Sequence, residues 1–270
     1  MSAALEFLMD LFETGLSYSS INTARSALST IVTFPNGESL GKHPLISRFL
    51  RGVFVMRPSF PRYQSIWDAS VVLRSFDSME SNSQLSLRHL SYKAVTLLAL
   101  LTAQRVQTLH VLMLDDIVLT DTECHIAVRR LLKQTRPGRH LSEIVLPAFP
   151  SNKNVCVVEV LHEYVARTSP LRGTAQTMFI SYRKPHKAVS RDTLSRWIKH
   201  TLSNAGVDQS VFKAHSVRAA ATSAASTCGV PLQTILATAG WSGSSTFARF
   251  YNKPVANAPA FSTTLQQTVV

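Results

Sequence analysis

His215-Ser-Val-Arg218, followed by Gly240-Trp241 and then by Arg249-Phe-Tyr251-Asn-Lys253, is the stretch that decides how this chain is interpreted. The order puts a histidine and an arginine one helical turn apart, then a large ring with an N–H donor, then a tyrosine beside basic residues. Phosphate oxygens bind cationic and N–H donors, a role that suits the guanidinium, the imidazole and the indole Nε1–H. The tyrosine would supply a nucleophile, so the stretch indicates a site that holds and attacks a phosphodiester.

Two basic residues upstream extend this pattern. Thr102-Ala-Gln-Arg105 ends a long apolar helix expected at about residues 86 to 103, and Lys133 precedes the turn Thr135-Arg-Pro-Gly-Arg139. Lys133 is the only lysine in its neighbourhood, and an ammonium can give up its proton, whereas a guanidinium rarely can. Lys133 is therefore the predicted general acid, with the nearby arginines as alternative phosphate-binding residues.

Each of these residues also has a plain structural explanation. A His-x-x-Arg pair such as His215 and Arg218 occurs by chance in many helices, and Trp241 after a glycine is ordinarily a core aromatic residue. Tyr251 would fit a half-buried helix position, and Arg105 would fit a helix C-terminus, where a cation is favoured by the macrodipole. The joint order of six side-chain types is what favours a functional site.

The order Arg105, Lys133, His215, Arg218, Trp241 and Tyr251 resembles the catalytic set of the tyrosine recombinase (phage-integrase-type) family. That set is Arg, Lys, His, Arg, His or Trp, and Tyr. The resemblance covers residues 67 to 255 well and the preceding part more loosely. Three phrases also look like the integrases of DIRS-type and Ngaro-type retroelements: Ser19-Ser-Ile-Asn-Thr-Ala-Arg-Ser-Ala-Leu28, Arg105-Val-Gln-Thr-Leu109 and Ser195-Arg-Trp-Ile-Lys199.

The sequence departs from the family at one position. Three residues beyond its first arginine the family often has an acidic residue that orients the site, and this chain has Thr108 there. Asp115 or Asp116 is the candidate for replacing it. The N-terminal helical region is also short for the family, which predicts a truncated or diverged element copy.

The resemblance implies a mechanism. Tyr251 would attack the scissile phosphate and form a 3′-phosphotyrosyl link, while Arg105 and Arg218 bind the non-bridging oxygens and Trp241 donates a further hydrogen bond. His215 would position or deprotonate the phenol or bind the phosphate. Lys133 would protonate the leaving 5′-oxygen. No metal or other cofactor is expected.

The resemblance also implies partners. The substrate would be double-stranded DNA, cut and rejoined during integration of a transposable element, by a homo-tetramer that is a monomer or weak oligomer without DNA. Residues 256–270 would pass to a neighbouring protomer, or would form a disordered tail.

Composition agrees with a globular protein that binds a polyanion. The chain has 270 residues, 45% of them hydrophobic, and its 28 Lys and Arg against 16 Asp and Glu give a net charge of +12. Such an excess favours nucleic acid, although a basic protein without that partner is the alternative. Three separated cysteines predict neither a disulfide framework nor a zinc site. Without a signal peptide or transmembrane run, an intracellular location is expected, the nucleus if the host is eukaryotic.

The expected fold is mainly α with a small antiparallel β-sheet (α+β). A helical, core-binding-like (SAM-like) DNA-binding domain is expected at 1–55, a linker at 56–66, the catalytic domain at 67–255 and a tail at 256–270. Strands are predicted at 117–119, 125–132 and 143–146, and helices at about 4–14, 19–33, 44–56, 67–79, 86–103, 154–167, 190–205, 213–228, 231–239 and 244–252. Ser19 and Ser20 are the candidate N-caps of the second helix.

The segments expected to face DNA contain the predicted DNA-binding residues Arg57, Arg62, Arg129, Arg130, Arg136 and Arg139. For the linker at 56–66, the alternative to a segment that lies along the DNA backbone is a plain surface segment. Three other functions remain open at this point: a type IB topoisomerase, a catalytically impaired or domesticated DNA-binding protein, and a basic helical scaffold with no dependence on DNA.

Overall fold

The computed structural model describes residues 1–34, 37–60, 63–132, 135–138 and 140–256, and it divides the chain into two compact units, Met1–Arg62 and Tyr63–Val270. Unit 1 consists of α1 (Ser2–Glu13), α2 (Tyr18–Ile31), a short 3-10 turn (Leu40–Lys42) and α3 (Pro44–Met56). These helices enclose a small core of Leu8, Ile21, Leu40, Ile46, Leu50 and Val53. The N-cap of α2 is Ser17, whose hydroxyl accepts a hydrogen bond from the Ser20 N–H at 3.3 Å. The prediction of Ser19 or Ser20 at this cap was wrong, because both lie inside the first turn.

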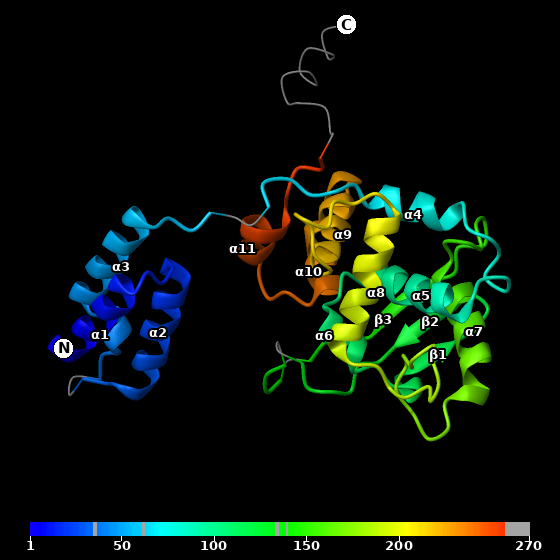
Figure 1. Cartoon of the computed structure of the whole chain (residues 1–270), viewed down its shortest axis with the longest axis horizontal. Helices are drawn as coiled ribbons and strands as arrows, with labels where there is room; N and C mark the ends of the chain where they lie inside the picture. Colours follow the sequence, from blue (N-terminus) through cyan, green and yellow to red (C-terminus); the bar gives the residue numbers. More distant parts are fainter. Residues whose placement is uncertain (35–36, 61–62, 133–134, 139, 257–270) are drawn as a thin grey trace, which may run out of the picture. The chain divides into compact units, whose positions relative to one another are not determined.

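Unit 2 is built around one helix. It contains α4 (Ala69–Asp77), α5 (Leu87–Thr102), α6 (Val106–His110), α7 (Val157–Thr168), α8 (Arg191–Asn204), α9 (Ser216–Thr227), α10 (Leu232–Ala239), α11 (Ser244–Thr246) and 3-10 turns at Leu114–Asp116 and Ser169–Leu171. Nearly every residue of α5 from Leu90 onward is buried. It contacts α7, α8 and α9, and Figure 1 shows it between α8 and α7. Its almost uncharged sequence is explained by this central position.

The sheet has three antiparallel strands in the order β1 (Ile117–Leu119), β2 (Glu123–Ile126) and β3 (Ile144–Pro147). Ile117 pairs with Ile126, and Cys124 pairs with Leu146. The sheet contacts α7, which lies beside it in Figure 1. This confirms a mainly helical fold with a small antiparallel sheet. The predicted strand 125–132 was too long, because β3 supplies partners only as far as Ile126.

Residues 63–66, which were expected in the linker, belong to unit 2. Tyr63, Ile66 and Trp67 are buried. The Ile66 N–H donates to the Pro254 carbonyl at 2.9 Å, and the Ile66 carbonyl accepts from the Ala256 N–H at 2.6 Å. The start of unit 2 is therefore paired with the segment that follows its last helical turn. Within the described residues, no helix is both long and apolar enough to cross a membrane.

Lys93, in the middle of α5, is fully buried, and its Nζ has no hydrogen-bond partner in the described part of the chain. The Nζ lies 5.9 Å from the centroid of the Phe76 ring. Burial lowers the pKa of Lys93 to about 8, and the charge of Asp77 opposes this effect only in part. Lys93 therefore lowers the stability of the fold at neutral pH, where it carries a charge.

Lys93→Met is expected to raise the free energy of unfolding at pH 7 by up to about 3 kcal/mol, because one pKa unit corresponds to about 1.4 kcal/mol. Below pH 8 the lysine is charged in both states and the burial penalty is complete. As the pH rises from about 8 to 10.5 the folded protein releases this proton first, so the wild type gains stability that the Met variant cannot gain. Urea unfolding at pH 7 and at pH 9.5 measures both effects, and equal pH slopes for the two proteins would contradict this account.

Candidate active site

Four of the six predicted catalytic residues line one cavity of about 450 Å³: Arg105, His215, Arg218 and Tyr251. They come from the segment after α5, from the start and first turn of α9, and from the helical turn at Phe247–Tyr251. The remaining lining residues are Ala99, Gln104, Val106, Asp192, Ser195, Lys199, Lys213, Ala214 and Val217. The cavity thus combines several cations with one carboxylate and a phenol.

Arg105 does not end α5, as predicted, but stands at the N-cap of α6. Helix α5 ends at Thr102, because Ala103 adopts a left-handed conformation with φ of 49°. The Gln104 side chain then fixes the connection by donating through Nε2 to the Thr238 carbonyl at 2.6 Å. A cation at a helix N-terminus gains nothing from the macrodipole, so the helix-capping explanation for Arg105 does not hold.

Thr108 occupies the position where an acidic residue was expected. It is buried, and its hydroxyl donates to Gln104 Oε1 at 3.3 Å. Asp116 is also buried, and its carboxylate accepts from the Met113 N–H at 3.2 Å, while Asp115 is exposed. Neither aspartate lines the cavity. The segment that carries Arg105 is therefore held by an uncharged pair, Thr108 and Gln104.

Arg218 is only 3% exposed and bridges the ends of two helices. Its Nη1 donates to the Ala103 carbonyl and its Nη2 to the Ala239 carbonyl, both at 2.6 Å. Both acceptors lie at helix C-termini, where carbonyls lack partners within the helix and the dipole favours a cation. Burial, and next the charge of Arg105, lower the pKa of Arg218 to about 10. The guanidinium therefore stays charged at neutral pH.

Trp241 and Tyr251 stack beside this guanidinium. Gly240 ends α10 with a positive φ of 67°. This conformation lets the backbone N–H of Trp241 donate back to the Leu236 carbonyl at 2.9 Å. The centroid of the Trp241 ring lies 4.2 Å from Arg218 Cζ and 4.6 Å from the centroid of the Tyr251 ring. The indole Nε1 is buried without a hydrogen-bond partner among the described residues. Trp241 does not line the cavity itself.

Tyr251 ends a π-helical turn, Phe247–Tyr251, that α9 holds in place. The Ser223 hydroxyl donates to the Tyr251 carbonyl at 2.6 Å and accepts from the Lys253 N–H at 3.1 Å. The predicted helix at 244–252 is therefore α11 followed by this turn. The contacts with Ser223 fix the backbone on either side of the phenol and direct its ring toward Arg218.

His215 is the N-cap residue of α9 and is exposed. Its Nε2 lies 3.3 Å from the Tyr63 hydroxyl, and the next residue, Ser216, accepts a hydrogen bond from Trp67 Nε1 at 2.9 Å. Two aromatic residues at the start of unit 2 thus position the turn that carries His215. Neither residue could be recognised from the sequence as part of the site, because about 150 positions separate the partners.

Lys133 lies outside the described residues, so its role as general acid stays a prediction. Two of the six predicted DNA-binding arginines, Arg62 and Arg139, also lie outside them. Arg129, Arg130 and Arg136 are exposed in the connection between β2 and β3. Those three are therefore accessible to a polyanion.

Arg57 is engaged within unit 1. Its Nη1 donates to the carbonyls of Phe12, at 2.7 Å, and Leu16, at 2.9 Å. Its Cζ lies 3.9 Å from the centroid of the Phe12 ring. These contacts give Arg57 a structural role at the end of α1, whereas contact with DNA stays a prediction.

Sequence reasoning missed four polar residues of the cavity: Asp192, Ser195, Lys199 and Lys213. The first three share one face of α8, a spacing that a helix predicted at 190–205 could have revealed. Lys213 stands two positions before His215, and its nearness in sequence was the available signal.

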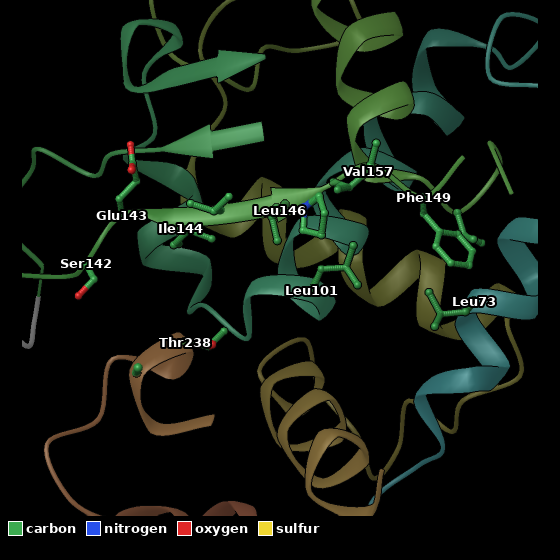
Figure 2. A pocket seen from close by; sticks show the side chains of 14 residues that line it. Leu73, Leu101, Ser142, Glu143, Ile144, Leu146, Phe149, Val157 and Thr238 are labelled. Atoms are coloured by element: carbon green, nitrogen blue, oxygen red, sulfur yellow. The ribbon is translucent and has the colours of Figure 1, made fainter. Parts of the chain in front are cut away.

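A larger cavity, of about 610 Å³, lies at the outer edge of the sheet (Figure 2). It is bounded by β3 and by residues of α4, α5, α7 and α10, among them Leu73, Leu101, Leu146 and Phe149. Its wall is mainly aliphatic and contains none of the five predicted catalytic residues that the structure describes. The smaller cavity, which has the cations and the phenol, is therefore the candidate active site.

Comparisons with known proteins place the chain in a family. No curated protein matches the sequence. The structure is similar to that of the Tn1549 transposon integrase in complex with transposon right end DNA, with a TM-score of 0.62 and 15% identity over 99% of this chain and 84% of that one. It is also similar to the XerH site-specific recombinase bound to palindromic difH substrate, with a TM-score of 0.58 and 16% identity over 89% of this chain and 65% of that one.

A lambda integrase tetramer bound to a Holliday junction matches with a TM-score of 0.51 and 16% identity over 96% of this chain and 65% of that one. The chain thus spans just under two thirds of the length of the XerH and lambda proteins. At these identities the likeness establishes the fold alone. The model of the phage integrase family, however, matches residues 70–257, which is more than half of the sequence. The chain therefore belongs to the phage integrase family, that of the tyrosine recombinases.

Proposed function

We propose that this protein is a site-specific DNA recombinase that cleaves and rejoins DNA strands through a 3′-phosphotyrosyl intermediate, in the integration of a mobile element. The observation that carries the proposal is the cavity shared by Arg105, His215, Arg218 and Tyr251. A phenol beside two guanidinium groups suits attack on a phosphodiester, because the cations stabilise the charge that develops on the non-bridging oxygens. Membership of the phage integrase family supports the same reaction.

In the proposed reaction the Tyr251 oxygen forms a bond to the scissile phosphorus while the bond from phosphorus to the 5′-oxygen breaks. His215 positions the phenol or accepts its proton, and Lys133 gives a proton to the leaving 5′-oxygen. The free 5′-hydroxyl of another strand later attacks the phosphotyrosine and restores the phenol. The covalent link conserves the energy of the phosphodiester, so neither a nucleotide nor another cofactor is needed.

The buried, unpartnered Nε1 of Trp241 supports its role as a further donor to the phosphate. Its ring lies against Arg218 and Tyr251, so a modest shift of the indole on DNA binding would bring the N–H toward the same anion. Exposed Arg129, Arg130 and Arg136, together with Arg62 and Arg139, would contact the DNA backbone. Unit 1 would act as the core-binding domain, joined by the linker to the catalytic unit.

The active oligomer in this proposal is a homo-tetramer on DNA, with residues 256–270 passed between protomers. The printed descriptions of similar structures include a lambda integrase dimer on a core site and a tetramer on a Holliday junction. Within the family, the phrases Ser19–Leu28, Arg105–Leu109 and Ser195–Lys199 support a place among the integrases of DIRS-type or Ngaro-type retroelements. The protein would then act in the nucleus of a eukaryotic host.

Incubation with nicked suicide substrates, on which the cut fragment diffuses away, tests the reaction. An SDS-resistant adduct should form in excess EDTA without nucleotide, because the cavity offers cations and one carboxylate rather than a cluster of carboxylates for metal ions. A labelled-strand gel should place the protein on the 3′ end. An adduct that needs magnesium, or a 5′ link, would contradict the mechanism, and DNA binding without any adduct would indicate an impaired DNA-binding protein.

Cleavage is expected to occur in cis, because Tyr251 lines the same cavity as the arginines of its own chain. Mixing Tyr251→Phe with Arg105→Ala should therefore restore no adduct beyond that of either variant alone. If a protomer donated its tyrosine to a neighbour, the mixture would assemble one complete site and recover a substantial fraction of wild-type cleavage. Adduct yield on a suicide substrate, at several ratios of the two variants, distinguishes the two arrangements.

A further inference from the structure

Lys213 is a second lysine of the active-site cavity, outside the six residues that the sequence pattern predicts. It lies in the connection from α8 to α9, two positions before His215. Its carbonyl accepts from the Ser216 N–H at 2.8 Å, and its Nζ donates to the Gln209 carbonyl at 2.5 Å. The half-buried ammonium is therefore held at the wall by the main chain, with two N–H donors left for another partner.

The charges of this cavity are unbalanced. Among the described residues, its wall has four cationic side chains, Arg105, Lys199, Lys213 and Arg218, against the single carboxylate of Asp192. In the described ranges, no carboxylate lies within 4.0 Å of the Lys213 or the Lys199 ammonium, and the charge of Asp208, which is not part of the wall, acts on Lys213 only at longer range. Repulsion is already felt within the cavity, since the charge of Arg105 contributes to the lowered pKa of Arg218. An anion that enters the cavity would remove this repulsion.

The bonds of Arg218 leave a need for another donor. One N–H of each of its terminal nitrogens is committed to the carbonyls of Ala103 and Ala239. A phosphodiester under attack has two non-bridging oxygens that gain charge, and each can accept more than one hydrogen bond. Lys199 is exposed on α8, whereas Lys213 is already anchored at the wall, so less side-chain entropy is lost when Lys213 binds an oxygen.

We propose that Lys213 binds a non-bridging oxygen of the scissile phosphate and shares its developing charge with Arg105. This assignment rests on the proposed recombinase function and adds a phosphate-binding residue to it. Lys213 is thereby distinguished from Lys133, which acts on the bridging 5′-oxygen. The two lysines differ in the oxygen that they contact, and chemically altered substrates can separate these roles.

Lys213→Gln is expected to slow cleavage of a suicide substrate by about ten- to a hundredfold, the range expected for a lost charge-assisted hydrogen bond. Lys213→Arg should keep most of the rate, because a guanidinium can bind the same oxygen. Lys153→Gln is the matched control: it removes the same charge from an exposed lysine whose ammonium lies 3.7 Å from Glu159, outside the cavity. Thermal melting of each variant separates a loss of fold from a loss of phosphate binding.

Two substrates define the atom that Lys213 contacts. With sulfur in place of the bridging 5′-oxygen, the leaving group needs no proton. On this substrate the cleavage rate of Lys133→Gln should return toward that of the wild type, whereas Lys213→Gln should still cleave slowly. On a substrate with a neutral methylphosphonate at the scissile position, Lys213→Gln and the wild type should cleave at similar rates. Wild-type protein that forms no adduct would refute the proposed function itself. Wild-type cleavage with an unaffected Lys213→Gln, or recovery of that variant on the sulfur substrate, would overturn the assignment of Lys213.

Discussion

Tyr251→Phe is expected to reduce covalent DNA attachment to background while changing DNA affinity by less than about tenfold. The substitution removes the oxygen proposed as the nucleophile but no charge, and one lost hydrogen bond is worth about 1 kcal/mol. The ring would keep its packing against Trp241 and its place beside the Arg218 guanidinium, although the hydrogen bond between the hydroxyl and Arg218 would be lost. SDS gels of suicide-substrate reactions measure attachment, and filter binding measures affinity.

Tyr18→Phe is the control for this experiment. It removes a phenol from the start of α2 in unit 1, outside the cavity, and should leave adduct formation unchanged. An SDS-resistant adduct of normal yield with Tyr251→Phe would assign the nucleophile to another residue. A large fall in affinity would instead show that the hydroxyl serves mainly to bind DNA.

Arg218→Gln is expected to abolish cleavage and also to lower the melting temperature by about 4 to 24 °C. The guanidinium satisfies the carbonyls of Ala103 and Ala239, and each buried group left without a partner costs about 1 to 3 kcal/mol. In a unit of this size, each kcal/mol corresponds to about 2 to 4 °C. The shorter glutamine side chain cannot reach both carbonyls, so the loss of activity and the loss of stability should appear together.

Calorimetry of Arg218→Gln alongside Tyr251→Phe tests this double role. Both variants should be inactive, yet only the first should melt early, because the phenol hydroxyl makes no comparable link between helices. Arg218→Lys should keep the charge and regain part of the stability. A melting temperature for Arg218→Gln within 2 °C of wild type, at about the measurement error, would mean that its contacts with the helix ends contribute nothing.

The helices and the order of the functional groups could be predicted from the sequence, for identifiable physical reasons. Helix α5 was expected at 86 to 103 and runs from Leu87 to Thr102, since its long apolar pattern and the Ser86 cap are local signals. Gly206, Gly229 and Gly240 mark three helix ends, and all three adopt positive φ. These features depend on near neighbours in the chain.

What could not be predicted depends on distant partners. Ala103 adopts a left-handed conformation without being glycine, so nothing in the sequence marked the break that places Arg105 on α6. The length of β2 depends on where β3 begins, beyond a long connection. In the site, Arg105, His215, Arg218 and Tyr251 meet as their order suggested, whereas the bond of Arg218 to two helix ends and the place of Lys213 in the wall became visible only in three dimensions.

The two bonds of Arg218 have a consequence for how such a protein would decay once recombination is no longer selected. Descendants of the protein that are selected only for DNA binding would tolerate the loss of the Tyr251 hydroxyl, because the ring would still pack in place. The same descendants would lose several degrees of melting temperature if Arg218 mutated, because the ends of α5 and α10 depend on that guanidinium. Inactive descendants should therefore keep the arginine long after the tyrosine has gone, and a surviving arginine alone is no sign of a working enzyme.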